Sequence, residues 1–266
     1  MSVLRHALLI AAFCAAAAAC DEAAESAGYM PCTPTSPPAE LGLDPFYTRY
    51  CDASGIPVLS SSEVPDEAIQ WVRFQAVQML EARPEVAAAM AERGTRIAIM
   101  AATQVTTDIP EHSDLNTAFP GTDWDLRARG LGATPVRPVS SAAAENVLCY
   151  AGDRYAGESI FIHEFAHSIA VMGLRYIDPG FDERLRAVYN AAIAAGLWAN
   201  TYAATNPGEY WAEGVQSWYD ANLQRDPPDG VHNAIDTRSE LAAYDPGLYR
   251  LIQQVLSEDA MPRCPP

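Results

Sequence analysis

Two histidines lie four positions apart in a segment that is apolar except for them and one glutamate, and this arrangement is the strongest constraint that the sequence places on the fold. The run reads His163-Glu164-Phe165-Ala166-His167, an HExxH pattern. On an α-helix, residues four apart are separated by only about 40° around the axis, so both imidazoles project from one face. Glu164 lies on the adjoining face. Burying these polar groups unpaired would cost about 1–3 kcal/mol each, so we expect a helix whose two imidazoles share a metal ion.

A catalytic zinc site needs a third protein ligand, with the fourth position left to water. Apart from this pair, only His112 and His232 follow the first twenty residues, and neither stands at the spacing of an HExxHxxGxxH pattern. The best candidates are therefore carboxylates on a later helix. Glu209 and Glu213 lie at i and i+4, on one face of the helix expected at 207–222.

The residues that start this later helix leave the choice between Glu209 and Glu213 open. Asn206 has the character of an N-cap, and Pro207 stands at the first helical position. Glu209, at the third position, completes a capping-box pattern that would engage its carboxylate with a backbone N–H. In that case Glu213 would be the ligand. From the residues alone, either carboxylate can serve.

Together the two segments resemble a known family. The HEFAH run is followed about forty residues later by Tyr-x6-Glu-Tyr-Trp-Ala-Glu, which spans Tyr202–Glu213. This combination is similar to the gluzincin metallopeptidases related to the catalytic domain of anthrax lethal factor. In that family the first Glu of the later segment is the third zinc ligand, and the second supports a ligand histidine. A Tyr seven residues before the ligand faces the substrate carbonyl. The resemblance covers residues 157–220 and includes no motif from the first half of the chain.

The resemblance implies a site with one Zn²⁺ held by His163, His167 and Glu209, with Glu213 orienting an imidazole. Glu164 would act as the general base toward a water molecule at the zinc, and Tyr202 would stabilise the oxyanion. A core tyrosine is the alternative for Tyr202. The fold implied is a zincin-like α+β domain, with a small twisted sheet packed on the HExxH helix and a mostly helical C-terminal part.

The N-terminus has the features of an export signal. Arg5 and His6 precede an apolar run from Ala7 to Ala19, which is too short to span a bilayer. We therefore expect residues 1–19 to be a signal peptide. The segment Ala17–Cys20 is similar to a bacterial lipobox, which predicts a cell-envelope lipoprotein anchored at Cys20. Simple secretion with a free Cys20 is the alternative.

Four further cysteines follow Cys20, and an even number in an exported protein predicts two disulfides. Of the three pairings that four cysteines allow, we favour Cys32–Cys51 and Cys149–Cys264. The first pair would close a short Pro-rich loop. The second would tie the C-terminal tail to the segment before the HExxH helix. No CxxC-type spacing supports a metal cluster instead.

Composition and periodicity describe the rest of the chain. We expect residues 20–40, rich in Pro, Ala and Ser, to form a tether, and residues 41–266 to form one catalytic domain. All 17 basic residues are arginine, and 34 acidic residues bring the formal charge to −17, which excludes nucleic acid as a partner. The patterns predict strands at 56–59 and 96–102, and helices starting near 65 and 84 and covering 157–172, 181–195, 207–222 and 246–256.

Residues 104–145 have no helical period and predict a functional loop or irregular edge strands. The stretch 124–132 concentrates aromatic, cationic and glycine residues. Arg127 and Arg129 are either salt-bridged on a surface loop or in contact with a substrate. Aromatic residues recur in the C-terminal half at helical spacing, which is typical of a core: Trp198, Tyr210, Trp211, Trp218 and Tyr219.

Three functions fit these observations. The first is an exported zinc metallopeptidase acting on peptides or proteins. The second is a zinc hydrolase of the same fold that acts on another bond, since a fold does not determine the substrate. The third is a surface lipoprotein with a non-catalytic zinc site, which would have no use for the carboxylate of Glu164. In each case membrane contact would come only through the N-terminal lipid.

Overall fold

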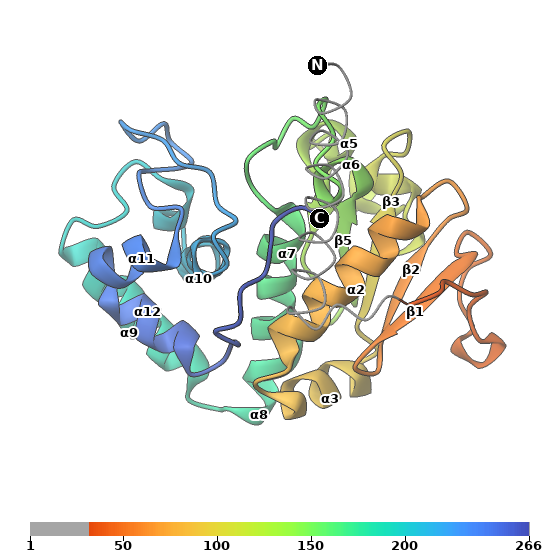
Figure 1. Cartoon of the computed structure of the whole chain (residues 1–266), viewed down its shortest axis with the longest axis horizontal. Coiled ribbons are helices and arrows are strands. Elements are labelled where there is room, and N and C mark those ends of the chain that lie inside the picture. Colours follow the sequence, from red (N-terminus) through yellow and green to blue (C-terminus); the bar gives the residue numbers. More distant parts are fainter. Residues whose placement is uncertain (1–31, 266) are drawn as a thin grey trace, which may run out of the picture.

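The computed structural model describes residues 32–265, which fold into an α+β architecture around one five-stranded mixed sheet (Figure 1). The helix with the two histidines runs through the middle of the molecule. The sheet lies on one side of it and the C-terminal helices gather on the other (Figure 1). The expected signal peptide, Cys20 and the start of the tether lie outside the described residues.

The sheet has the strand order β1-β2-β3-β5-β4. β1 pairs antiparallel with β2, while β2, β3 and β5 run parallel, and β4 pairs antiparallel with β5 at one edge. The strand bounds are Arg49–Ala53 (β1), Ile56–Ser60 (β2), Arg96–Met100 (β3), Gly130–Leu131 (β4) and Val139–Ala143 (β5). The strands expected at 56–59 and 96–102 are confirmed as β2 and β3.

β5 corrects the expectation that residues 104–145 form only a loop or irregular edge strands. All five residues of Val139–Ala143 are buried, and the strand pairs in parallel with β3 inside the sheet. Its Val-Ser-Ser-Ala-Ala sequence has no apolar alternation, so the strand pattern is hidden. The small side chains suit a strand covered on both faces. The Ser141 hydroxyl also accepts a hydrogen bond from the backbone N–H of Leu131 in β4, at 3.1 Å.

Helices α2 and α3 connect β2 to β3. Pro65 precedes α2, and Pro84 occupies the first position of α3, as the sequence predicts. α2 packs together with the histidine helix on one face of the sheet, in the main core (Figure 1). The described helices with at least seven residues are α2 (Asp66–Leu80), α3 (Pro84–Glu92), α7 (Ile160–Ser168), α9 (Phe181–Ala194), α10 (Pro207–Trp218), α11 (Arg238–Tyr244) and α12 (Pro246–Gln253).

Shorter helical turns join these elements. They are Ala39–Leu41, Thr106–Asp108, Pro110–His112, Leu115–Ala118 (α4), Trp124–Arg127 (α5), Ala144–Val147 (α6), Arg175–Ile177 (α8) and Tyr202–Ala204. Three of the four predicted C-terminal helices end within about four residues of their expected limits. α11 is not among the predicted helices, although Thr237 and Glu240 form a capping box at its start.

The histidine helix does not end at residue 172, contrary to the expected range of 157–172. α7 continues through a π-helical segment, Ile169–Leu174, and then into α8. A Cβ on Gly173 would approach the Val86 side chain to 2.6 Å, so the missing side chain allows α3 to pack closely. π-helical segments are frequent next to functional sites, and this one starts two residues after His167.

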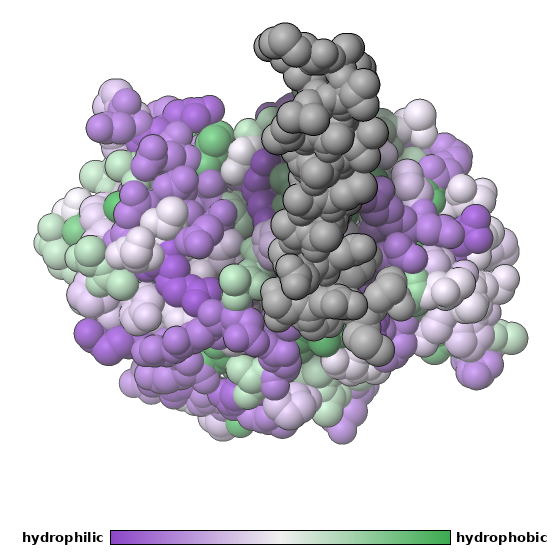
Figure 2. Space-filling model, viewed as in Figure 1, coloured by the Kyte–Doolittle hydropathy of each residue, from purple (hydrophilic) through white to green (hydrophobic). Residues whose placement is uncertain are grey.

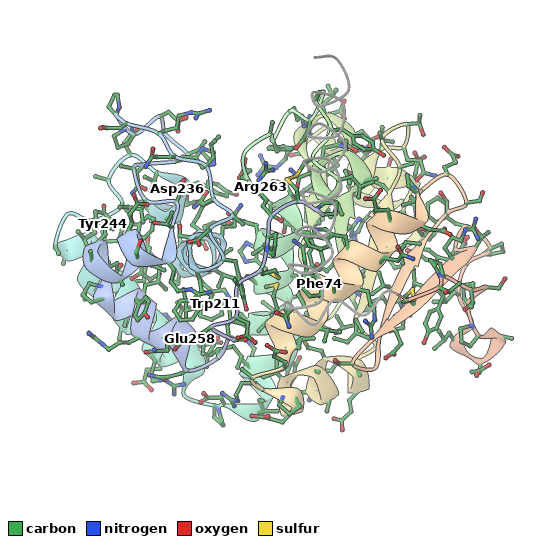
Figure 3. The ribbon with its side chains drawn as sticks, in the orientation of Figure 1. Phe74, Trp211, Asp236, Tyr244, Glu258 and Arg263 are labelled. Carbon is green, nitrogen blue, oxygen red and sulfur yellow. A yellow bond between two sulfur atoms is a disulfide. The ribbon has the colours of Figure 1, made fainter. Side chains whose placement is uncertain are left out.

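The C-terminal aromatic residues form a core, as expected. All five are buried to at least 98%: Trp198, Tyr210, Trp211, Trp218 and Tyr219. Trp211 lies between α10 and α7 (Figure 3), where its indole N–H donates to the carbonyl oxygen of Ala166 at 2.9 Å. This contact fixes α10 against the histidine helix.

Both predicted disulfides are present in the structure, Cys32–Cys51 and Cys149–Cys264. The first holds residue 32 against β1, next to a bridge between Thr35 and Tyr50. The second holds the C-terminal segment, which also accepts a hydrogen bond from Trp71 on α2. Two disulfides indicate an oxidising, extracellular environment. Within residues 32–265, no helix combines the length and apolar character needed to cross a bilayer.

We expect the two disulfides to differ in their contribution to stability. Cys149–Cys264 links residues 115 positions apart, and Cys32–Cys51 links residues 19 apart. A disulfide that closes a longer loop removes more entropy from the unfolded chain. Replacing Cys149 and Cys264 with alanine should therefore lower the free energy of unfolding by about 5 kcal/mol, and replacing Cys32 and Cys51 should lower it by about 3 kcal/mol. Urea unfolding of the two double variants measures this difference. A larger loss in the Cys32–Cys51 variant would contradict the ranking by loop length.

Candidate metal centre

Three side chains from two helices converge on one point. The Nε2 atoms of His163 and His167 lie 3.2 Å apart, and each is 3.1 Å from Oε2 of Glu209. All three atoms lie within 4.8 Å of one another, in a group that is buried or partly buried. Two imidazole nitrogens and one carboxylate oxygen are a donor set that binds zinc and leaves a further coordination position open. The cluster could therefore hold a metal ion.

The start of α10 shows why Glu209, rather than Glu213, reaches the imidazoles. The side chain of Asn206 caps the helix and accepts hydrogen bonds from the N–H groups of Gly208 and Glu209, at 2.9 and 3.1 Å. The Glu209 carboxylate faces the two imidazoles, so it does not complete the reciprocal half of the capping box. The sequence has the capping-box pattern, but in the structure Asn206 caps the helix and Glu209 does not take part.

A glutamine that the sequence analysis did not name orients His163. Gln216 Oε1 lies 2.8 Å from His163 Nδ1, while its amide N–H₂ group donates to Ser159 O at 3.2 Å and Glu158 Oε2 at 3.3 Å. The two acceptors at the other end fix the orientation of the amide. A neutral His163 imidazole therefore donates through Nδ1, which leaves the lone pair of Nε2 for a metal ion at the point where Nε2 meets Glu209 and His167.

Glu213 lies behind His163, and the resemblance gives it the role of supporting this histidine. Its Oε1 atom is 3.7 Å from His163 Nδ1, beyond hydrogen-bond distance, and Asn222 donates to its Oε2 at 3.0 Å. Burial raises the pKa of Glu213, with a smaller opposing effect from His163. In this structure Gln216 takes the hydrogen-bonding position that the resemblance assigns to Glu213.

The surroundings of the imidazoles favour positive charge. Burial alone lowers the pKa of His163, but the hydrogen bond to Glu209 and the charges of Glu164 and Glu213 overcome it and raise the pKa to about 10. Burial raises the pKa of Glu209, and the hydrogen bonds to the two imidazoles reverse this and bring the pKa well below its usual range. A divalent cation would supply the positive charge that these carboxylates favour.

Replacing Gln216 with Leu is expected to weaken zinc binding by roughly 10- to 100-fold, because partners behind a metal ligand typically contribute this much. Leucine keeps the volume but leaves His163 Nδ1 without an acceptor. The measurement is a zinc dissociation constant from competition with a chromogenic chelator. Gln254→Leu, which makes the same change at the exposed residue that follows α12, is the control. Unchanged affinity in Gln216→Leu would show that the amide does not set the orientation of His163.

A cavity of about 620 Å³ opens in front of the cluster. Glu164 lines it, and within residues 32–265 no hydrogen bond or ion pair engages its carboxylate. Tyr202 also lines the cavity, with its ring centroid 6.3 Å from that of His163 and the rings 22° apart. Burial, followed by the charge of Glu209, raises the pKa of Tyr202 to about 12, so its hydroxyl stays protonated at neutral pH. Tyr202 therefore faces the cavity and not the core.

The edge strand β4 and the glycine after it form one wall of this cavity. A Cβ on Gly132 would lie 2.8 Å from His167 Cβ and 3.2 Å from the Glu164 carbonyl oxygen. Only glycine allows the backbone to pass this close to α7. The Gly-Leu-Gly sequence at 130–132 thus brings an extended segment directly beside the candidate metal centre.

The two arginines of the 124–132 stretch have different surroundings. Arg129 is buried, pairs with Glu145 at 2.7 Å and donates to the carbonyl oxygens of Gln104 and Ala101. It therefore stabilises the loop. Arg127 is exposed at the rim and lines the cavity, and it forms no ion pair within the described chain.

Two buried groups behind the cluster were not found from the sequence. Glu158 accepts from Gln216 and lies 3.3 Å from Nε2 of His232, which is 7% exposed. His232 stands in a loop, so no periodicity could place it there. Gln216 did carry a usable pattern, because Glu209, Glu213 and Gln216 lie at i, i+4 and i+7 on one helix face.

No protein-family model matches the chain, and no curated protein is significantly similar to it.

Proposed function

We propose that this protein is an exported zinc-dependent metallopeptidase. The observation that carries the proposal is the convergence of His163, His167 and Glu209 beside a carboxylate, Glu164, which has no partner among residues 32–265 and faces the same cavity. A structural metal site would close its remaining position with a protein ligand and would have no need for a base beside it. An open site with an adjacent base is the arrangement that hydrolysis requires.

The residues would divide the work as follows. His163, His167 and Glu209 would hold the zinc ion, which when bound supplies a Lewis acid that acidifies water and polarises a carbonyl group. Glu164 would accept the proton from the attacking water and deliver it to the leaving amine. The protonated hydroxyl of Tyr202 would donate a hydrogen bond to the oxygen that gains negative charge.

The fold supports a zincin-like assignment in the lethal factor group, which is part of this proposal. A small sheet packs on the HExxH helix, its edge strand β4 runs beside the candidate metal centre, and a helix from the C-terminal part delivers the third ligand. A non-peptidase zinc hydrolase of the same fold is the second candidate, since a hydrolytic zinc site does not by itself select an amide bond.

The test combines zinc content with cleavage of an unstructured protein and a peptide library. One zinc ion per chain, with cleavage that a chelator removes and added zinc restores, is the result expected. Zinc binding without any peptide cleavage would overturn the peptidase assignment and favour the second candidate. If the metal-free protein binds no divalent metal ion at all, the proposed metal centre would be overturned as well.

We further propose that the mature protein begins at Cys20 and is anchored there by lipid, with secretion as the alternative. The observations that support export are the apolar segment before Cys20 and the two disulfides. Mass spectrometry of the mature N-terminus tests this, and an unmodified Cys20 would overturn the lipid anchor.

A further inference from the structure

The cavity beside the candidate metal centre has one cationic side chain that no carboxylate neutralises within residues 32–265. Arg129, the other arginine in its lining, is buried and bound to Glu145. Arg127 is exposed at the rim, and its guanidinium lies 5.9 Å from the centroid of the Trp124 ring. An arginine against an aromatic face keeps its hydrogen-bond donors free at its edge.

The nearest carboxylates in the sequence are engaged with other groups. Asp123 caps α5 and accepts from the N–H groups of Asp125 and Leu126, at 3.2 and 3.1 Å. Asp125 accepts from both the backbone N–H and the hydroxyl of Thr107, each at 2.9 Å. Neither aspartate pairs with Arg127, although both are within four residues of it.

The carbonyl end of α5 is held from a different part of the chain. Arg154 donates to Leu126 O at 2.7 Å, and the Tyr155 hydroxyl donates to Arg127 O at 3.2 Å. α5 is therefore held at its start by the Asp123 cap and at its end by the contacts of Arg154 and Tyr155. The guanidinium of Arg127 has no ion-pair partner in the described chain. Such a cation is suited to binding an anion, because the backbone that carries it is already ordered before the ligand binds.

The position of Arg127 in the cavity restricts which anion it can reach. Arg127 lines the same cavity as Tyr202, whose ring stacks beside His163. Apart from the two arginines, the charged residues in the cavity lining are four glutamates and the two histidines of the cluster, and the glutamates are Glu158, Glu164, Glu209 and Glu213. A substrate carboxylate would be repelled from that region and attracted only near Arg127.

We propose that Arg127 binds a substrate carboxylate close to the scissile bond, so that the enzyme prefers peptides with an acidic group at that position. This inference rests on the proposed peptidase function. A planar guanidinium can bind a carboxylate through two parallel hydrogen bonds. The carboxylate can belong to an Asp or Glu side chain or to the free C-terminus of the peptide, and both present the same group to Arg127.

The test uses a peptide that the zinc-loaded protein cleaves, made in two series. In one, Glu is compared with Gln at each position around the cleaved bond, and in the other, a free C-terminus is compared with its amide. We expect kcat/KM to be roughly 10- to 100-fold higher for the carboxylate form in one series, as a charged hydrogen-bonded pair contributes. In Arg127→Ala this ratio should fall to about 1. Arg186→Ala, exposed on α9, should keep the wild-type ratio.

Binding provides a readout that does not depend on turnover. In the zinc-loaded Glu164→Gln protein, Arg127→Ala should weaken binding of the preferred carboxylate peptide by a similar factor, measured by calorimetry. Equal ratios in wild type and Arg127→Ala, with peptides still cleaved, would overturn this inference alone. Failure of the zinc-loaded protein to cleave any peptide would overturn the proposed function, and this inference with it.

Discussion

Replacing Glu164 with Gln is expected to abolish peptide hydrolysis while zinc binding is retained. Glutamine has the size of glutamate but cannot accept a proton, and general-base catalysis typically contributes 10²- to 10⁴-fold. Glu164 is not among the three side chains that converge on the candidate metal centre, so the ligand set is unchanged. The measurements are kcat on a cleaved peptide and the zinc content of the purified variant.

The control for this variant is Glu183→Gln, which makes the same chemical change at an exposed position of α9. We expect it to keep wild-type activity. Hydrolysis at the wild-type rate in Glu164→Gln would refute the role of Glu164 as the base. Loss of both zinc and activity would indicate instead that Glu164 helps to hold the metal.

The helical part of the fold could be predicted because its apolar period is visible in the sequence. α2, α3, α7, α9, α10 and α12 all lie where periodicity and proline positions place them. β5 could not be predicted, because Val-Ser-Ser-Ala-Ala shows neither alternation nor a continuous apolar run. Its burial on both faces comes from tertiary packing, because α7 contacts the strand from one side and Val139 and Ala143 pack with Ile109 in a second apolar cluster.

Among residues 32–265, the buried acidic side chains are Asp153, Glu158, Glu213 and Asp245, so most of the carboxylates are in contact with solvent. The visible face over the C-terminal helices is mainly hydrophilic, with apolar residues scattered singly (Figure 2). This pattern agrees with a solvated acidic surface, as the composition suggests. The acids at the candidate metal centre are an exception, because they lie buried or partly buried beside two histidines.

The candidate ligands could be predicted from helical spacing, and the contacts that depend on loops or on the docking of two helices could not. The spacing of His163 and His167 fixes their common face, and the i, i+4 positions restrict the third ligand to two carboxylates. Glu158 and His232 meet behind the cluster from two loops far apart in the sequence. The partner of His163 likewise depends on how α10 docks on α7, which sets Gln216 closer than Glu213.

Glu209→Gln and Glu213→Gln are expected to differ sharply in zinc affinity. Oε2 of Glu209 is 3.1 Å from both imidazole Nε2 atoms, so its loss removes one of three ligands. We expect the zinc dissociation constant of Glu209→Gln to rise by more than roughly 100-fold, which is the largest loss of affinity typical of residues that only support a ligand. In Glu213→Gln the change should stay within about tenfold, because Gln216 still accepts from His163. Chelator competition measures both constants.

Stability separates the two glutamates independently of the metal. Burial of Glu213 disfavours its charged form, and the neutral amide of a glutamine can still accept the hydrogen bond from Asn222. Glu213→Gln should therefore unfold at the same temperature as the wild type or higher. Zinc should raise the unfolding temperature of this variant and have little effect on Glu209→Gln, because a ligand stabilises only the state that binds it. The reverse pattern would make Glu213 the ligand, as the capping-box alternative requires.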